Sequence, residues 1–205
     1  MQRWIQVLLG LPWRDRFRWG SRKVREAVGG GDRIRTEDRM LLEDMLLPAY
    51  ASEPAVGELL FVGCESYTRS YADAFGPGRF RTIDIDPAQA RHGTPDHIVA
   101  PIQDVARHVA AASLDVVVMN GVYGWGVDDR PGLTAALTAV ATVLKPGGRL
   151  VLGWNDVPVL GPFDPEPVVI EAGLERDPTS PLGAWRVATD TPTRHTFDAY
   201  RRTAP

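Results

Sequence analysis

The chain has a single cysteine, Cys64, among 205 residues. One thiol excludes an internal disulfide framework and cannot build a thiolate metal cluster by itself, so a reducing, cytoplasmic setting is the default expectation. Histidine is also scarce, and the spacing to carboxylates is not that of a metal site for any of His92, His97, His108 and His195. We therefore expect neither disulfides nor a bound metal.

Long apolar runs and an excess of positive charge are missing as well. No apolar run approaches the roughly 20 residues of a membrane-spanning helix, and charges interrupt the N-terminal stretch where a signal peptide needs an apolar core. With a net charge of -3, the whole chain offers no electrostatic footprint for nucleic acid. Its hydrophobic content of 44% suffices for one well-buried globular domain.

The N-terminal segment differs from the rest in charge and aromatic content. Residues 1–25 hold seven Arg or Lys, one acid and four large aromatics. Within this segment one helical face carries Trp4, Val7, Leu8 and Leu11. The simplest interpretation is a helix packed on the domain with a solvated basic face. A lid over the substrate, or a contact with an acidic partner or a membrane interface, is the alternative. We assign 1–50 to a helical extension or lid and 51–205 to the main domain.

One βαβ unit is predicted next. Residues 59–62 form a short apolar strand that stops at Gly63, 67–75 can form a helix, and 80–85 form a second apolar strand carrying Asp84. In such a unit the first strand runs into a helix N-terminus, whose free N–H groups favour a polar or anionic ligand group. Asp84 follows Gly63 by 21 positions, at the strand edge where a carboxylate can accept hydrogen bonds from both hydroxyls of a ribose. The unit predicts a nucleoside pocket.

The turn after the first strand lacks the glycines that a dinucleotide requires. It reads GCESYT from Gly63 onward, so the second and third glycines of G-x-G-x-x-G are missing. Glu65 would also set a negative charge where a pyrophosphate would lie. This disfavours an NAD-dependent oxidoreductase, but it tolerates a ligand without phosphates such as S-adenosylmethionine.

Short apolar strands alternate with helices along the remaining chain. Further strands are predicted at 97–100, 114–120 and 149–154, and helices at 36–48, 87–93, 103–112, 133–144 and 168–174. The segments 184–188 and 195–200 are too close in sequence for a crossover helix, so they should be antiparallel neighbours. The pattern predicts an α/β fold with a doubly wound, mostly parallel seven-stranded sheet, an antiparallel last strand and N-terminal helices.

These features, in this order, resemble the class I S-adenosylmethionine-dependent methyltransferases over roughly residues 56–202. The matching segments are ELLFVGC, TIDIDP, HIVAPIQD, LDVVVMNGVYGWG and VLKPGGRLVLGW. KPGG before an apolar strand is the most telling of them. The resemblance implies a Rossmann-like fold, S-adenosylmethionine as the cofactor, and methyl transfer as the activity.

The resemblance also carries the family's cofactor site onto this chain. The turn at Gly63 would hold the methionine portion, Asp84 the ribose hydroxyls, and Asn120 would line the sulfonium side. Ile85 would lie against the adenine, with 102–103 at its edge. The full set implied is Gly63, Cys64, Glu65, Asp84, Ile85, Ile102, Gln103, Asn120 and Gly121.

Two departures from the family pattern bear on function. The acid usual near the end of the first strand is Phe61 here, and Glu65 is a candidate to replace it by facing the ligand's ammonium group. The N-P-P-Y type of signature for methylation of nucleic-acid bases is absent, since the fourth strand ends in NGVY at 120–123. We expect a small-molecule acceptor rather than nucleic acid.

The leading hypothesis is a cytoplasmic enzyme that methylates a small molecule by in-line transfer. Its alternative is a non-catalytic binding or scaffold protein with the same fold. Tyr123 and Trp125 follow the fourth strand and could form an aromatic wall beside a cationic centre, or equally belong to the core. Asn155 follows the fifth strand and could touch the acceptor. The sequence indicates no general base and no oligomeric state.

Overall fold

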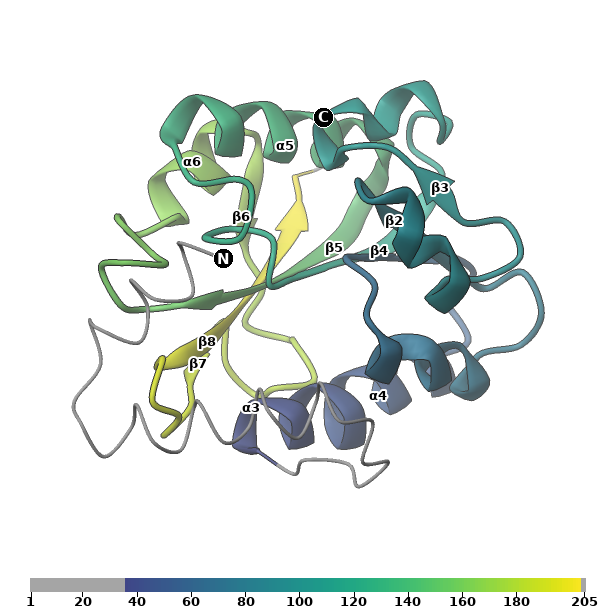
Figure 1. The fold of residues 1–205 in the computed structure, drawn as a ribbon, viewed down its shortest axis with the longest axis horizontal. Helices are drawn as coiled ribbons and strands as arrows, with labels where there is room; N and C mark the ends of the chain where they lie inside the picture. Colours follow the sequence, from purple (N-terminus) through teal and green to yellow (C-terminus); the bar gives the residue numbers. More distant parts are fainter. Residues whose placement is uncertain (1–35, 204–205) are drawn as a thin grey trace.

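The computed structural model describes residues 36–203 of the chain, so the segment at 4–11 that was predicted to be helical lies outside the described residues. The strands are β1 (Leu59–Val62), β2 (Phe80–Asp84), β3 (Ile98–Val99), β4 (Leu114–Asn120), β5 (Leu144–Asn155), β6 (Leu174–Arg176), β7 (Arg186–Ala188) and β8 (His195–Arg202). The helices are α3 (Glu37–Met40), η1 (Leu41–Leu46), α4 (Leu47–Ser52), η2 (Ser66–Ala74), η3 (Pro87–His92), η4 (Ile102–Arg107), α5 (Arg130–Val143) and α6 (Glu166–Glu171). The strands form one sheet with helices on both faces (Figure 1).

The described residues form an eight-stranded sheet in the order β3-β2-β1-β4-β5-β8-β6, with β7 also paired to β8. The strands from β3 to β5 are parallel, while β8 runs antiparallel to β5 and to its other neighbours. The chain builds outward from β1 to β3 and then returns to β4 on the other side of β1, which creates a crevice at the carboxyl ends of the strands.

The predicted doubly wound architecture and the antiparallel closing strands are confirmed, but one strand was missed. Residues 174–176 form β6 at the sheet edge, where a helix had been expected to run to Leu174. The helix α6 ends at Glu171 instead, and Gly173 then adopts a φ of 84°. A three-residue edge strand carries too short a pattern to be recognised from sequence.

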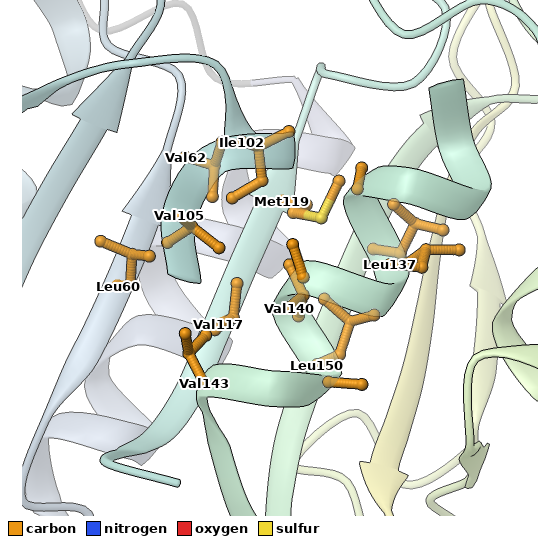
Figure 2. Packing of buried hydrophobic residues seen from close by; sticks show 14 of the residues in the cluster. Leu60, Val62, Ile102, Val105, Val117, Met119, Leu137, Val140, Val143 and Leu150 are labelled. Atoms are coloured by element: carbon orange, nitrogen blue, oxygen red, sulfur yellow. The ribbon is translucent and has the colours of Figure 1, made fainter. Parts of the chain in front are cut away.

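The central strands are mostly apolar because both of their faces are buried. In β1, Leu60 packs on the side of η4 and α5, while its neighbour Phe61 faces the N-terminal helices. In β4, Val117 and Val118 divide between the same two clusters. Figure 2 shows the first cluster filling the space between the strands and α5. Full burial of each such side chain is worth about 1.5–3 kcal/mol, so this double layer holds the site's strands in place.

The helix α5 starts earlier than the apolar pattern alone predicts. The Asp129 side chain accepts a hydrogen bond from Gly132 N at 2.8 Å, and Pro131 occupies the first turn. Both features favour a helix start three residues before the first apolar side chain, Leu133. Helix α5 ends at Val143, and the KPGG segment, which was expected to precede the strand at 149–154, is already part of β5.

The N-terminal helices α3, η1 and α4 follow one another directly and cover the face of the sheet opposite α5 (Figure 1). The helix was predicted to end at Pro48, but it continues to Ser52. The wider π-helical turn η1 lies just before Pro48, whose missing N–H and ring would disrupt a regular α-helical turn. The prediction that this helix packs on the sheet is confirmed by the burial of Leu46 and Tyr50.

Candidate functional site

A cavity of about 510 Å³ lies where the parallel strands β1, β2 and β4 end. Its size falls within the roughly 300–1,000 Å³ of typical small-molecule pockets. It lies at the switch in strand order between β1 and β4, where ligands of open α/β sheets bind.

The turn after β1 is tied to the end of β2. Gly63 has a φ of 88°, a conformation that side chains other than glycine rarely adopt. This turn lets Cys64 N donate to Asp84 Oδ2 at 2.7 Å, while Asp86 N donates to Asp84 Oδ1 at 2.8 Å. Each oxygen of the Asp84 carboxylate is thus oriented by one backbone N–H and keeps further accepting capacity. Gly63 and Asp84 therefore lie side by side, as the βαβ unit predicts.

Six of the nine residues implied for the cofactor site line this cavity: Gly63, Cys64, Glu65, Asp84, Asn120 and Gly121. Three others do not. Ile85 is 69% exposed beyond the end of β2, and Ile102 is buried in the core between β4 and α5. Gln103, its neighbour, lies outside the lining as well. The structure therefore brings together the side predicted for methionine and ribose, and leaves the predicted adenine contacts outside the cavity.

Cys64 lines the cavity as a protonated thiol. It is 2% exposed, and burial, reinforced by the nearby Asp84 carboxylate, raises the pKa of the Cys64 thiol to about 11. Since the thiolate is the reactive form, alkylation of the folded protein by iodoacetamide at pH 8 is expected to be more than tenfold slower than that of the urea-unfolded chain. Mass spectrometry of timed samples measures both rates, and equal rates would contradict this placement of Cys64.

The residues proposed for the acceptor side divide between the cavity and the core. Trp125 and Asn155 line the cavity. Tyr123 belongs to the core instead: it is fully buried, its hydroxyl donates to Phe163 O at 2.6 Å, and its ring packs against Trp154. The loop after β4 thus points one of its two aromatic side chains inward and presents the other to the cavity.

Sequence reasoning missed His195 at the start of β8. Its ring nitrogens lie 2.9 Å from Asn120 Oδ1 and 3.0 Å from Asn155 Oδ1, and all three residues line the cavity. An asparagine amide offers both an acceptor oxygen and a donor NH₂, so the two asparagines can hold this imidazole in either protonation state. The antiparallel register pairs Asn155 with His195 directly. Pairing the strands predicted at 149–154 and 195–200 in this register would have placed His195 at the site.

A small residue at position 153 makes room for the His195 cluster. A Cβ on Gly153 would lie 2.1 Å from Asn120 Oδ1 and 3.0 Å from His195 Nε2. Gly153→Ala is therefore expected to displace the Asn120 side chain and lower the free energy of unfolding by about 1–2 kcal/mol, as measured by urea denaturation. Gly76→Ala is the control, because its nearest neighbour would lie at an ordinary 3.6 Å. Equal stability of the two variants would contradict the described packing.

The N-terminal helices, which belong to the segment 1–50 assigned to an extension or lid, also reach the cavity. Asp38 and Arg39 of α3 and Leu42 of η1 line it, together with Thr193 from the connection before β8. These contacts depend on how segments far apart in sequence pack, which local patterns do not reveal.

Residues 36–203 contain neither a candidate metal site nor a helix suited to span a membrane. This part of the chain holds no group of three or more His, Cys, Asp or Glu side chains that could bind a metal ion. None of its helices is long and apolar enough to cross a membrane.

Comparison with known proteins identifies the domain. A family model described as "Methyltransferase domain" matches residues 60–152. The N-methyltransferase NodS from Bradyrhizobium japonicum WM9, solved with S-adenosyl-l-homocysteine, superposes with a TM-score of 0.61 at 18% identity, covering 85% of this chain and 90% of that one. A TehB-like SAM-dependent methyltransferase from Corynebacterium glutamicum gives a TM-score of 0.56 at 16% identity, with coverages of 90% and 96%.

The comparison with curated proteins found no matching sequence. At identities below 25%, the solved structures establish the shared fold, and the family model adds the nature of the domain. Residues 60–152 thus match a methyltransferase domain, and the described chain shares the fold of solved S-adenosylmethionine-dependent methyltransferases.

Proposed function

We propose that this methyltransferase transfers the methyl group of S-adenosylmethionine to a small-molecule acceptor in the cytoplasm. The observation that carries the proposal is the Asp84 carboxylate, which backbone N–H groups hold at the edge of a cavity that extends to Asn120 and Asn155. One end of the cavity is thus suited to a ribose, and the other end is free for an acceptor.

Besides the Asp84 carboxylate, a second polar group at the cofactor end is suited to an adenosine. Gln89 lines the cavity with a buried Oε1 that has no hydrogen-bond partner within residues 36–203. Leaving a buried acceptor unpaired is costly, and a ribose hydroxyl or the adenine amino group would supply the missing donor. In this proposal Asp84 accepts from the ribose hydroxyls, and Glu65, exposed at the start of η2, faces the ammonium group.

Bound S-adenosylmethionine supplies an electrophilic methyl group. An acceptor held in line with the carbon–sulfur bond would receive this methyl group, and the bond's electron pair would stay on the sulfur. Alignment and exclusion of water are what the protein can contribute. Asn120 and Gly121 would flank the sulfur, while Trp125 and Asn155 would restrict the acceptor to the adjoining space.

A small acceptor agrees with the size and surroundings of the site. Cofactor and acceptor would have to share about 510 Å³. The helices α3 and η1 already cover this end of the sheet, so an intact nucleic acid or protein domain would have little access. We also propose that residues 1–50 form an extension or lid and that residues 51–205 form the catalytic domain.

Calorimetric titration with S-adenosylmethionine and S-adenosylhomocysteine tests the proposed function. We expect saturable binding of both, together with a rise in melting temperature. Absence of both heat and thermal shift with either ligand would contradict it.

A further inference from the structure

The cavity contains a carboxylate that nothing in the described chain pairs with. Asp38 lines the cavity, its Oδ1 is buried, and that oxygen accepts no hydrogen bond from residues 36–203. A buried carboxylate oxygen without a donor is unfavourable. A ligand that brings a hydrogen-bond donor or a positive charge would remove this cost.

Two hydrogen bonds fix the position of Asp38. Asp190 N donates to Glu37 Oε2 at 2.6 Å, and the Tyr71 hydroxyl donates to Glu43 Oε1 at 2.7 Å. The first bond attaches the start of α3 to the turn before β8, the turn that also carries Thr193 into the cavity. This bond therefore holds together the two segments from which Asp38 and Thr193 line the cavity.

The basic side chain beside Asp38 is directed to other groups. The Arg39 guanidinium lies over the Tyr67 ring, 3.7 Å from its centroid, and 3.8 Å from Glu43 Oε1. Arg39 lines the cavity as well, but its guanidinium contacts Tyr67 and Glu43, and Asp38 Oδ1 accepts no hydrogen bond from it. The negative charge of Asp38 thus remains available to a ligand.

Aromatic side chains line the same cavity. Trp125 follows β4, and Tyr67 and Tyr71 come from η2. The faces of such rings attract cations electrostatically, as the Arg39 guanidinium over the Tyr67 ring illustrates. Aromatic walls and an unpaired carboxylate together favour a positively charged ligand over a neutral or negative one.

We infer that the acceptor is an amine, bound as its ammonium form, and that Asp38 is the residue that selects it. This inference rests on the proposed methyl transfer and names its substrate class. The ammonium group would donate to Asp38 Oδ1, and its hydrocarbon part would pack against Trp125. Before methyl transfer the ammonium group would release one proton to solvent, because only the free amine has the lone pair that forms the new carbon–nitrogen bond. Asp38 is a specificity-determining residue in this account and takes no part in binding the cofactor.

Three small probes that differ only in their polar group test the inference. Phenethylamine, 2-phenylethanol and phenylacetate are titrated into the full chain by ligand-observed NMR, with and without saturating S-adenosylhomocysteine. The amine is expected to bind at least about tenfold more tightly than the alcohol or the acid. In Asp38→Asn the amine should lose this advantage, while the dissociation constant of S-adenosylhomocysteine changes less than about twofold.

Asp73→Asn is the matched control, because Asp73 is an exposed carboxylate on η2 that does not line the cavity. It should behave as wild type with all three probes. The inference is contradicted if the wild-type protein prefers the acid or alcohol, or shows no preference. It is equally contradicted if Asp38→Asn weakens S-adenosylhomocysteine and amine binding alike. Failure of wild-type protein to bind S-adenosylhomocysteine would instead contradict the proposed function.

Discussion

Replacing Arg186 with methionine is expected to lower the free energy of unfolding by about 3–5 kcal/mol. Its guanidinium donates to both oxygens of Asp198, at 2.7 Å each, and Asp198 is fully buried. Trp154 and Tyr200 also donate to this carboxylate. Removing only the cation leaves a buried charge with neutral partners, which costs more than the pair itself contributes. Denaturation in urea at pH 7 measures the loss.

The pH dependence of this variant gives a second check on Asp198. Burial raises the pKa of the Asp198 carboxyl, and Arg186 opposes this rise. A carboxyl whose folded pKa lies above its unfolded value destabilises the protein above that folded pKa. The deficit of Arg186→Met should therefore shrink as the pH falls from 7 toward the raised pKa, where Asp198 takes up a proton.

Two controls isolate the buried pair. Adding Asp198→Asn to Arg186→Met should restore part of the lost stability, because the neutral amide still accepts from Trp154 or Tyr200. Arg201→Met removes an exposed pair with Glu175 and should cost less than about 1 kcal/mol. If Arg186→Met were no more destabilising than this surface variant, the role assigned to the pair would be wrong.

This buried network lies next to the candidate site. Trp154 precedes Asn155 in β5, and Asp198 lies three residues after His195 in β8. It holds the two antiparallel strands together where their ends meet the cavity. Loosening it is therefore expected to disturb the positions of Asn155 and His195 as well as stability.

Replacing Asp84 with alanine should weaken binding of S-adenosylhomocysteine by about 3 kcal/mol, a factor of roughly 150 in dissociation constant. The variant loses the proposed ribose contacts, and it also leaves Cys64 N without the carboxylate that orients the Gly63 turn. Isothermal titration calorimetry measures the change. Circular dichroism shows whether the fold persists.

Asp84→Asn separates these two effects. Its amide oxygen can still accept from Cys64 N, but only one oxygen remains and the charge is gone. An intermediate loss of affinity is expected. Unchanged affinity in Asp84→Ala would mean that the ribose binds elsewhere.

The βαβ part of the site could be predicted because its parts are neighbours in sequence. The parallel register of β1 and β2 pairs Val62 with Ile83, which by itself brings Gly63 beside Asp84. A strand, a glycine turn and an edge acid leave little freedom in that arrangement. The apolar pattern of β4 was equally sufficient to place Asn120 at the same edge.

The rest of the site could not be predicted because it depends on contacts between distant segments. His195 meets Asn120 across 75 positions and Asn155 across 40, and both contacts follow from the register of β8 against β5. Asp38 reaches the cavity from a helix whose Glu37 is bonded to Asp190, 153 positions away. The inward turn of Tyr123 likewise depends on its bond to Phe163, which lies beyond β5.

The central claim is that Gly63 and Asp84 hold an adenosine whose sulfur faces Asn120. A crystal structure of the full chain with S-adenosylhomocysteine tests it most directly. The account predicts both ribose hydroxyls within about 3 Å of the Asp84 carboxylate, the sulfur beside Asn120 and Gly121, and open space between the sulfur and Trp125. A ligand bound outside this cavity, or with its ribose directed away from Asp84, would contradict it.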